Sequence, residues 1–161
     1  GVFAVQLARH FGADVTGVCS SANTALVGEL GAHTVIDYKC EDFTQGGDRY
    51  DLILDTLGVS RFSRCKRVLK SEGRQVFVSF QFHHLLQAAW TYLRPGKRVI
   101  CGFSGGSKAD LQYIIGLVAS GTLRPVIDHE YDLDDIVAAH RYVETGRKRG
   151  SLIVRVATEH I

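Results

Sequence analysis

Tyr50-Asp-Leu-Ile-Leu-Asp-Thr-Leu-Gly58 is the stretch that decides the fold. Its first six residues are mostly apolar, which is typical of a strand buried on both faces of a parallel sheet. Helical and extended patterns alternate on both sides of it, as far as Gly121. This alternation predicts an α/β fold, a doubly wound parallel sheet with helices on both faces. Such sheets bind ligands at the carboxyl ends of their strands.

The order of elements at the amino end is unusual for such a sheet. Residues 2–11 are predicted to form a helix that Gly12 ends, and residues 13–19 form the next strand. A helix in first place predicts a sheet that lacks its first strand, the strand whose following turn normally holds phosphate-binding glycines. The chain also contains no methionine, even at position 1. Together these observations indicate a piece of a longer protein.

Composition excludes several classes of partner. The chain has 161 residues and a net charge of +2, so neither nucleic acid nor a membrane is an expected partner. The short basic run at 147–149 is interpreted as a solvated loop. The four cysteines are far apart and form no Cys-x-x-Cys pair, so a zinc site is not expected. They predict reduced, mostly buried thiols and a cytoplasmic protein.

The end of the strand at 13–19 bears on the choice of cofactor. An acidic residue at this place favours NAD, because it binds the ribose hydroxyls. Ser20 and Ser21 stand there instead, and they favour NADP because small hydroxyl side chains leave room for a 2′-phosphate. The alternative is that they only cap a helix, and both roles are compatible. Tyr38 follows the next strand, either at the adenosine end or as a packed surface residue.

Three later strands end at the same level of the predicted sheet. Leu57 and Gly58 follow the strand at 50–55, and Gly58 permits a close approach of the backbone to a ligand. Phe80 occupies the same level after the next strand. Phe103 and Ser104 occupy it after the strand at 98–102. Their shared level is the argument for a common site.

The chain resembles the medium-chain dehydrogenase/reductase superfamily, and within it the zinc-independent, quinone-oxidoreductase-like alcohol dehydrogenases. The resemblance covers essentially the whole chain. It is carried by the order and spacing of five stretches, which are Val5-Gln-Leu-Ala8, Gly12-Ala-Asp-Val-Thr-Gly-Val-Cys-Ser20, Leu30-Gly-Ala-His-Thr-Val-Ile-Asp-Tyr38, Tyr50-Asp-Leu-Ile-Leu-Asp-Thr-Leu-Gly58 and Leu123-Arg-Pro-Val-Ile-Asp128.

The resemblance implies NADPH as cofactor, no zinc, and no catalytic residue in this chain. It makes Gly1 the last glycine of the phosphate turn. Asn23 stands where many relatives carry Lys or Arg. This departure weakens the preference for NADP. Arg147 or Arg149 is considered as the residue that supplies the missing positive charge. The implied cofactor contacts are Ser20, Ser21 and Tyr38 at the 2′-phosphate, and Leu57, Gly58, Phe80, Phe103 and Ser104 along the ribose and nicotinamide.

Residues 1–124 are then expected to form the cofactor-binding domain. Residues 125–161 are expected to return to an absent GroES-like domain, which leaves the last strand without partners. Relatives often dimerise through the edge strand at 98–102, so a homodimer through this strand is expected of the full-length parent, and aggregation is the alternative for this piece.

The implied function is hydride transfer between NADPH and a carbonyl, quinone or enone, with a small-molecule substrate in the full-length parent. This chain alone is expected to bind NADPH weakly or not at all, and to be inactive. The alternative is a non-catalytic remnant or interaction module that retains only the fold.

Overall fold

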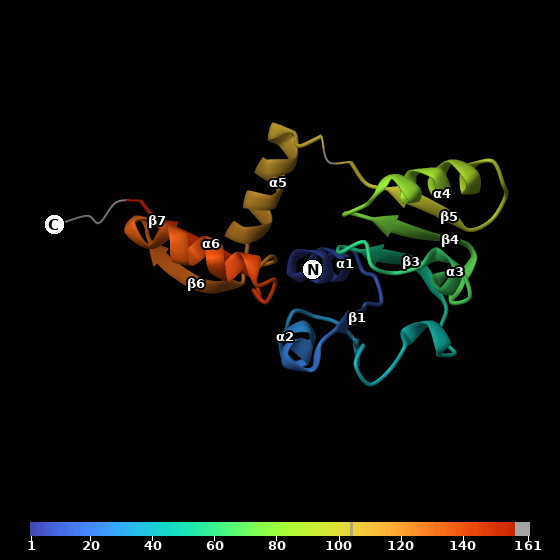
Figure 1. Ribbon diagram of the computed structural model, residues 1–161, viewed down its shortest axis with the longest axis horizontal. Helices are drawn as coiled ribbons and strands as arrows, with labels where there is room; N and C mark the ends of the chain where they lie inside the picture. The colour runs from blue at the N-terminus through green and yellow to red at the C-terminus, as the bar shows by residue number, and fades with distance from the viewer. Residues whose placement is uncertain (104, 157–161) are drawn as a thin grey trace. The chain divides into compact units, whose positions relative to one another are not determined.

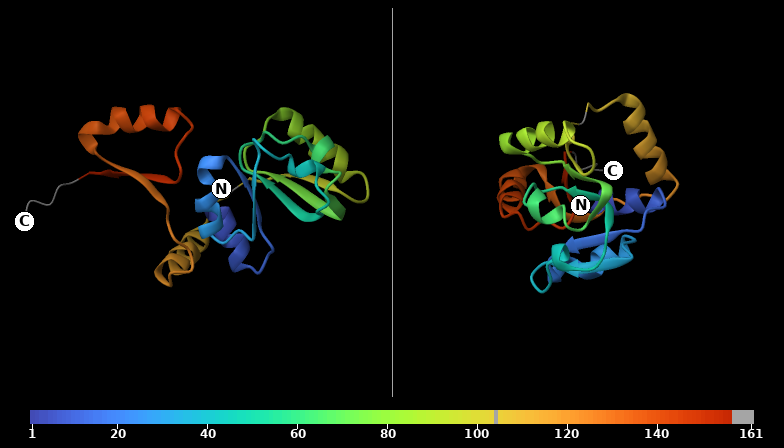
Figure 2. Two further views of the ribbon diagram at one scale, coloured as in Figure 1. Left: turned by 90° about the horizontal axis from the view of Figure 1, so that it is seen from below. Right: turned by 90° about the vertical axis from the view of Figure 1, so that its right-hand side faces the viewer.

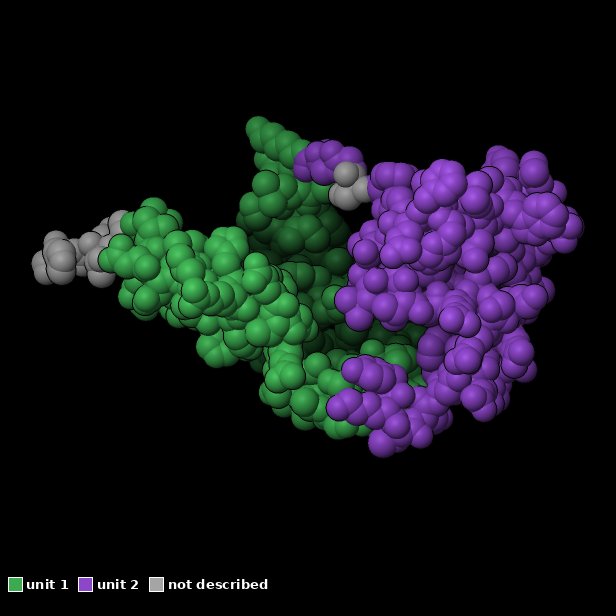
Figure 3. Space-filling view, in the orientation of Figure 1, with its two compact units in different colours: residues 1–37, 108–161 green, residues 38–107 purple. Residues whose placement is uncertain are grey.

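The computed structural model describes residues 1–103 and 105–156 (Figure 1). Helices and strands alternate along the chain, and every strand pair is parallel, which confirms the predicted α/β fold with a Rossmann-like arrangement. The chain forms two compact units. Unit 1 comprises residues 1–37 and 108–161, and unit 2 comprises residues 38–107 (Figure 3).

The first part of unit 1 contains one helix before its first strand, as predicted. The elements are α1 (Val2–His10), β1 (Thr16–Cys19), the 3-10 turn η1 (Ser21–Asn23), α2 (Thr24–Glu29) and β2 (Thr34–Asp37). β1 and β2 pair in parallel, with Cys19 opposite Asp37. Their carboxyl ends therefore lie side by side.

The second part of unit 1 is a strand-helix-strand element (Figure 2). It follows α5 (Lys108–Ala119) and consists of β6 (Ile127–Asp132), η3 (Leu133–Asp135), α6 (Ile136–Glu144) and β7 (Ser151–Arg155). The expectation that the last strand lacks partners is wrong, because β7 pairs in parallel with β6. The pairing begins where the Ser151 N–H donates to the Val126 carbonyl at 2.7 Å.

The two parts of unit 1 are joined by the side chain of Gln6 on α1. Its amide nitrogen donates to the Arg124 carbonyl at 3.0 Å, and its amide oxygen accepts from the Arg124 N–H at 2.7 Å. The same nitrogen also donates to the Val2 carbonyl at 3.1 Å. Gln6 is buried, so these bonds are shielded from water. A single side chain thereby satisfies both backbone groups of a residue 118 positions away.

Replacing this side chain tests its contribution. Gln6→Leu keeps the approximate volume but leaves the Arg124 N–H and carbonyl without their partners, so the free energy of unfolding should fall by about 2–3 kcal/mol. Gln112→Leu, on the exposed surface of α5, is the matched control and should change it by less than about 0.5 kcal/mol. Urea denaturation measures both; equal effects in the two variants would contradict the role of Gln6.

Unit 2 is a three-stranded parallel sheet in the order β3-β4-β5. Its elements are η2 (Phe43–Gln45), β3 (Tyr50–Asp55), α3 (Phe62–Cys65), β4 (Leu69–Phe77), α4 (Phe82–Tyr92) and β5 (Arg98–Cys101). The residues at 71–73 predict a turn before a strand at 75–79. The structure differs, because β4 includes residues 71–73 and runs from Leu69 to Phe77.

Only one face of this sheet is covered by helices of the described part of unit 2. Phe77, Gln75 and Val99 are buried on that face, against which α3 and α4 pack. Leu52 and Leu54 on the other face are 54% and 43% exposed. The expectation that β3 is buried on both faces is therefore wrong, because both helices of the unit lie on one side (Figure 2).

β1 and β3 belong to different sheets. All four cysteines are free thiols, but only Cys65 is buried, and Cys40 is exposed. The expectation of mostly buried thiols is thus wrong. Among the described residues, no helix is long and apolar enough to cross a membrane.

Candidate functional site

The ends of the three strands of unit 2 meet at one level. Asp55 is opposite Phe77, and Phe77 is opposite Cys101. The register continues past the strands, since the Val78 N–H donates to the Asp55 carbonyl and the Gly102 N–H to the Phe77 carbonyl, both at 2.9 Å. The residues that follow therefore leave the sheet together, as a ligand site at the carboxyl ends of parallel strands requires.

Four of the predicted residues gather at this level, and we call them the strand-end site; they are Leu57, Gly58, Phe80 and Phe103. The rings of Phe80 and Phe103 meet edge to face with centroids 4.8 Å apart. Leu57 and Phe103 are 73% and 79% exposed, so both present apolar surface outward. Ser104 lies outside the described residues.

Gly58 fits its position because a side chain would not. Its φ is +71°, in the left-handed region that favours glycine. A Cβ at this position would also collide with the carbonyl oxygen of Ser79. Glycine therefore lets the turn after β3 lie directly against the end of β4, which brings Leu57 to the level of Phe80.

Asp55 holds that turn, a role that the sequence analysis missed. Its carboxylate accepts from the backbone N–H groups of Leu57, Gly58 and Ser60, at 2.9, 2.8 and 2.7 Å, and from the Ser60 hydroxyl. Burial opposes the charge, but these hydrogen bonds outweigh it and lower the pKa of Asp55. An Asp followed by Thr-Leu-Gly was the available sequence signal, since Asp side chains bond backbone N–H groups two residues on.

A second group of predicted residues lies at the end of β1 in unit 1. Ser20 directly precedes η1, and its hydroxyl oxygen accepts a hydrogen bond from the Asn23 side-chain nitrogen at 3.3 Å. The Ser20 side chain makes no capping hydrogen bond to the described backbone of η1. The side-chain oxygen of Asn23 is buried and has no protein partner. A buried polar atom without a partner carries an energetic cost, and a bound ligand group would relieve it.

Asp37 is a further acidic group at this edge that the sequence analysis did not single out. The Ser21 hydroxyl donates to its carboxylate. Burial and the charge of Asp37 both raise the pKa of the Cys19 thiol. Cys19 and Asp37 lie close together because they are paired across the parallel strands β1 and β2. This pairing depends on the register of the two strands, which the sequence did not specify.

Tyr38 directly follows β2 and is 60% exposed, so its ring is not a packed residue of the core. Gly1 precedes α1 and is exposed, and no side chain caps this end of the helix. The charge of Lys148 acts at this end of α1, where the helix dipole is positive.

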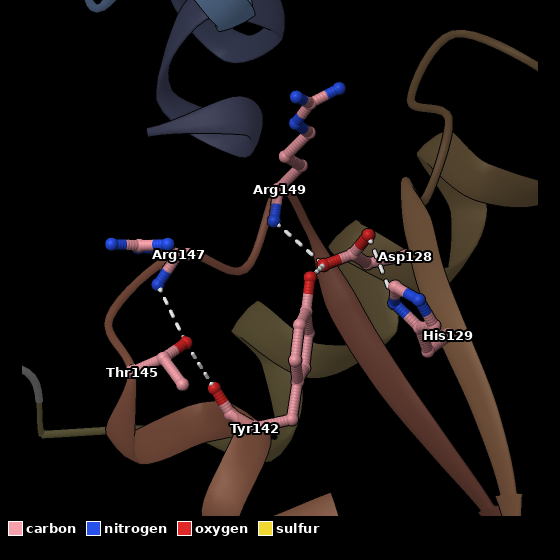
Figure 4. Close-up of polar contacts among 6 residues, drawn as sticks. All are labelled: Asp128, His129, Tyr142, Thr145, Arg147 and Arg149. Atoms are coloured by element: carbon pink, nitrogen blue, oxygen red, sulfur yellow. Dashed lines mark hydrogen bonds and ion pairs between the residues drawn. The ribbon is translucent and has the colours of Figure 1, made fainter.

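The loop that carries Lys148 is fixed by Asp128 (Figure 4). The Asp128 carboxylate accepts from the Tyr142 hydroxyl at 2.8 Å and from the Arg149 N–H at 2.9 Å. Both hydrogen bonds lower the pKa of the Asp128 carboxyl group, and the bond that Tyr142 donates raises the pKa of the Tyr142 hydroxyl group. The Arg147 N–H donates to the Thr145 hydroxyl at 3.3 Å. The basic run is thus a structured loop, and Figure 4 shows the guanidinium group of Arg149 directed away from Asp128.

A protein metal site needs several His, Cys, Asp or Glu side chains that converge on one ion. The described residues contain no group of three His, Cys, Asp or Glu side chains that could hold an ion.

Comparison with known proteins places this architecture. The chain is 29% identical to the mitochondrial NAD(P)H oxidoreductase RTN4IP1 of Danio rerio, over 97% of this chain and 46% of that protein. It is 32% identical to 2-methylene-furan-3-one reductase of Solanum lycopersicum, over 96% of this chain and 37% of that one. The structure of the quinone oxidoreductase from Coxiella burnetii superposes with a TM-score of 0.83 at 28% identity, covering 96% of this chain and 49% of that one.

The chain thus spans about half the length, or less, of the curated relatives it matches. The family profile described as zinc-binding dehydrogenase matches residues 30–154, which is most of the chain. These residues include β2, the sheet of unit 2 and the strand-helix-strand element. The chain therefore belongs to the zinc-binding dehydrogenase family of the medium-chain dehydrogenase/reductase superfamily.

Proposed function

We propose that this chain holds a nicotinamide dinucleotide, NADP in preference to NAD, in a protein that reduces a carbonyl, quinone or enone substrate. The observation that carries the proposal is the strand-end site, where an Asp55-held turn and two aromatic rings lie at one level of a parallel sheet. The names of the relatives, which include NAD(P)H oxidoreductase and quinone oxidoreductase, support the same reaction class. When bound, the nicotinamide ring supplies the hydride.

The strand-end site would hold the ribose and nicotinamide part of the cofactor. Leu57 and Phe103 offer exposed apolar surface for the ring. The rings of Phe80 and Phe103, which meet edge to face, add aromatic surface beside it. These residues bind and orient, and no proton transfer is assigned to them.

The phosphates and the adenosine end would be held by unit 1. The free N–H groups at the start of α1, after Gly1, attract anions, and Lys148 adds a charge there. Ser20, Ser21 and the unpartnered Asn23 oxygen lie where β1 ends. No acidic residue occupies positions 20–23, which supports NADP, whereas the Asp37 carboxylate bonded to Ser21 acts against it. Tyr38 is proposed as a contact of the same end.

Homodimerisation through β5 is part of this proposal. Within the described residues β5 pairs with β4 on one side only, so its other edge has backbone groups available to a second copy. The cytoplasmic location likewise stays a prediction.

The preference for NADP is tested by adding a carboxylate at the adenosine end. We expect the chain to bind NADPH more tightly than NADH in calorimetric titration, and Asn23→Asp to weaken NADPH binding about tenfold through repulsion of the 2′-phosphate. NADH lacks that group, so its affinity should change by less than about threefold. Asn23→Ala is the uncharged control.

Two results would count against the proposal. Equal affinity of the unmodified chain for both nucleotides would remove the preference for NADP. Binding of neither nucleotide would favour the alternative, a module that retains the fold without the cofactor.

A further inference from the structure

Unit 2 contains a second polar cavity of about 310 Å³, apart from most of the strand-end site. We call it the His84 pocket. It shares Gly58 with the strand-end site, but Leu57, Phe80 and Phe103 do not line it. Its lining residues are Gly58, Val59, Ser60, Arg61, Phe62, Ser63, His83, His84 and Gln87. They come from the chain between β3 and α3, from the first residues of α3 and from the first half of α4.

His84 is buried, with 4% of its surface exposed. Its Nδ1 accepts from the Gln81 N–H at 3.0 Å, as part of the capping box of α4. Because Nδ1 is an acceptor, the neutral ring carries its hydrogen on Nε2. Among the residues that the structure describes, nothing bonds Nε2. The ring packs against Phe77, at 4.2 Å between centroids, which sets the direction in which its N–H donor points.

The remaining lining groups favour an anion. One Arg and two His line the pocket, and none of the nine residues is acidic. Arg61 is exposed, and in the described part of the chain its guanidinium group has no ion-pair partner. The Gln87 side-chain oxygen is buried and has no partner among the described residues, and as an acceptor it suits a donor group of a ligand and not the anion itself.

Asp55 is the carboxylate whose charge reaches this pocket. Burial and the neighbouring His83 lower the pKa of His84, and the charge of Asp55 partly offsets this by raising it. However, the Asp55 carboxylate already accepts hydrogen bonds from three backbone N–H groups and one hydroxyl. These donors compensate much of its charge, so the pocket retains its preference for an anion.

We propose that the His84 pocket binds a small molecule through an anionic oxygen group, a phosphate or a carboxylate. The His84 Nε2–H and the Arg61 guanidinium group donate to the anionic oxygens, and the Ser63 hydroxyl provides a third donor. Charge-assisted bonds of this type are the stronger class of hydrogen bond. The cavity is larger than a single phosphate ion, and its volume is that of a small-molecule site.

The test uses the 161-residue chain, with inorganic phosphate and acetate as probes, at constant ionic strength set with NaCl. Two-dimensional NMR should show a saturable shift of the His84 ring resonances with at least one probe. Phosphate binding alone would indicate a phosphate-bearing ligand, and acetate binding alone a carboxylate. No saturable shift with either probe would overturn the proposal.

Variants separate this pocket from other basic positions. Arg61→Gln should weaken binding of the active probe about tenfold. Arg67→Gln, an exposed arginine in the same segment that does not line the pocket, should change it less than about twofold. Lys148→Gln should likewise have little effect, because Lys148 lies in unit 1. Binding that is lost in Lys148→Gln and kept in Arg61→Gln would place the anion at α1 and overturn the proposal.

Discussion

Gly58→Ala should lower the free energy of unfolding by about 2–5 kcal/mol. A residue with a Cβ pays about 1–2 kcal/mol for a left-handed conformation, and Gly58 has a φ of +71°. The new methyl group would also collide with the Ser79 carbonyl oxygen, which belongs to the backbone and cannot rotate away. Overpacking of this kind costs typically about 1–3 kcal/mol more. The turn after β3 must then move away from the end of β4.

The same change should also weaken cofactor binding, because Leu57 belongs to the displaced turn. We expect nucleotide binding to weaken by at least about tenfold in Gly58→Ala, measured by calorimetry at a temperature where the variant is folded. Gly46→Ala is the matched control. Its backbone φ is −69°, and its Cβ would lie 3.7 Å from the nearest atom, an ordinary contact. If both variants unfold at the same urea concentration, the turn is not constrained as described.

Asp55→Ala should have an effect of similar size, about 3–5 kcal/mol, through lost hydrogen bonds. The change leaves the N–H groups of Leu57, Gly58 and Ser60 without their acceptor. Each unsatisfied buried donor costs about 1–3 kcal/mol, and the terms are not additive. Asp51→Ala on the same strand removes only an exposed ion pair with Lys70, and it should cost less than about 1 kcal/mol.

The effect of Asp55 should also depend on pH. Its pKa is lowered in the folded protein, so the ionised carboxylate stabilises the fold above the unfolded value, near about 3.9. That contribution is lost as the pH falls through the lower, folded pKa. The difference in stability between the unmodified chain and Asp55→Ala should therefore be largest near neutral pH and shrink in acid. A difference that stays constant down to about pH 2 would show that the charge is not involved.

Much of the fold followed from patterns that are local in the sequence. The apolar run at 50–55 and the alternation around it predicted parallel pairing, because strands and helices differ in their hydrophobic period. Gly58 was identified as a point of close backbone approach, and the structure gives it the left-handed φ. The level shared by Gly58, Phe80 and Phe103 was also predictable, since it needs only the order of strands in a parallel sheet.

Burial was less predictable, because it depends on what covers each face. Leu52 and Leu54 are as apolar as core residues, yet they are exposed, since α3 and α4 pack against the opposite face. The partner of β7 was missed for a related reason. The sequence marks residues 151–156 as extended, but pairing with β6 depends on a contact between Ser151 and Val126.

The sequence by itself determined the class of fold, the family and the shared level of the strand ends in unit 2, because these depend on period, order and spacing along the chain. Only the tertiary structure decided which polar groups act together. The bonds of Gln6 to Arg124, of Ser21 to Asp37 and of Asp55 to its turn, and the unpartnered nitrogen of His84, follow from strand register and side-chain direction. Those properties arise from packing between distant segments, and they leave no period in the sequence.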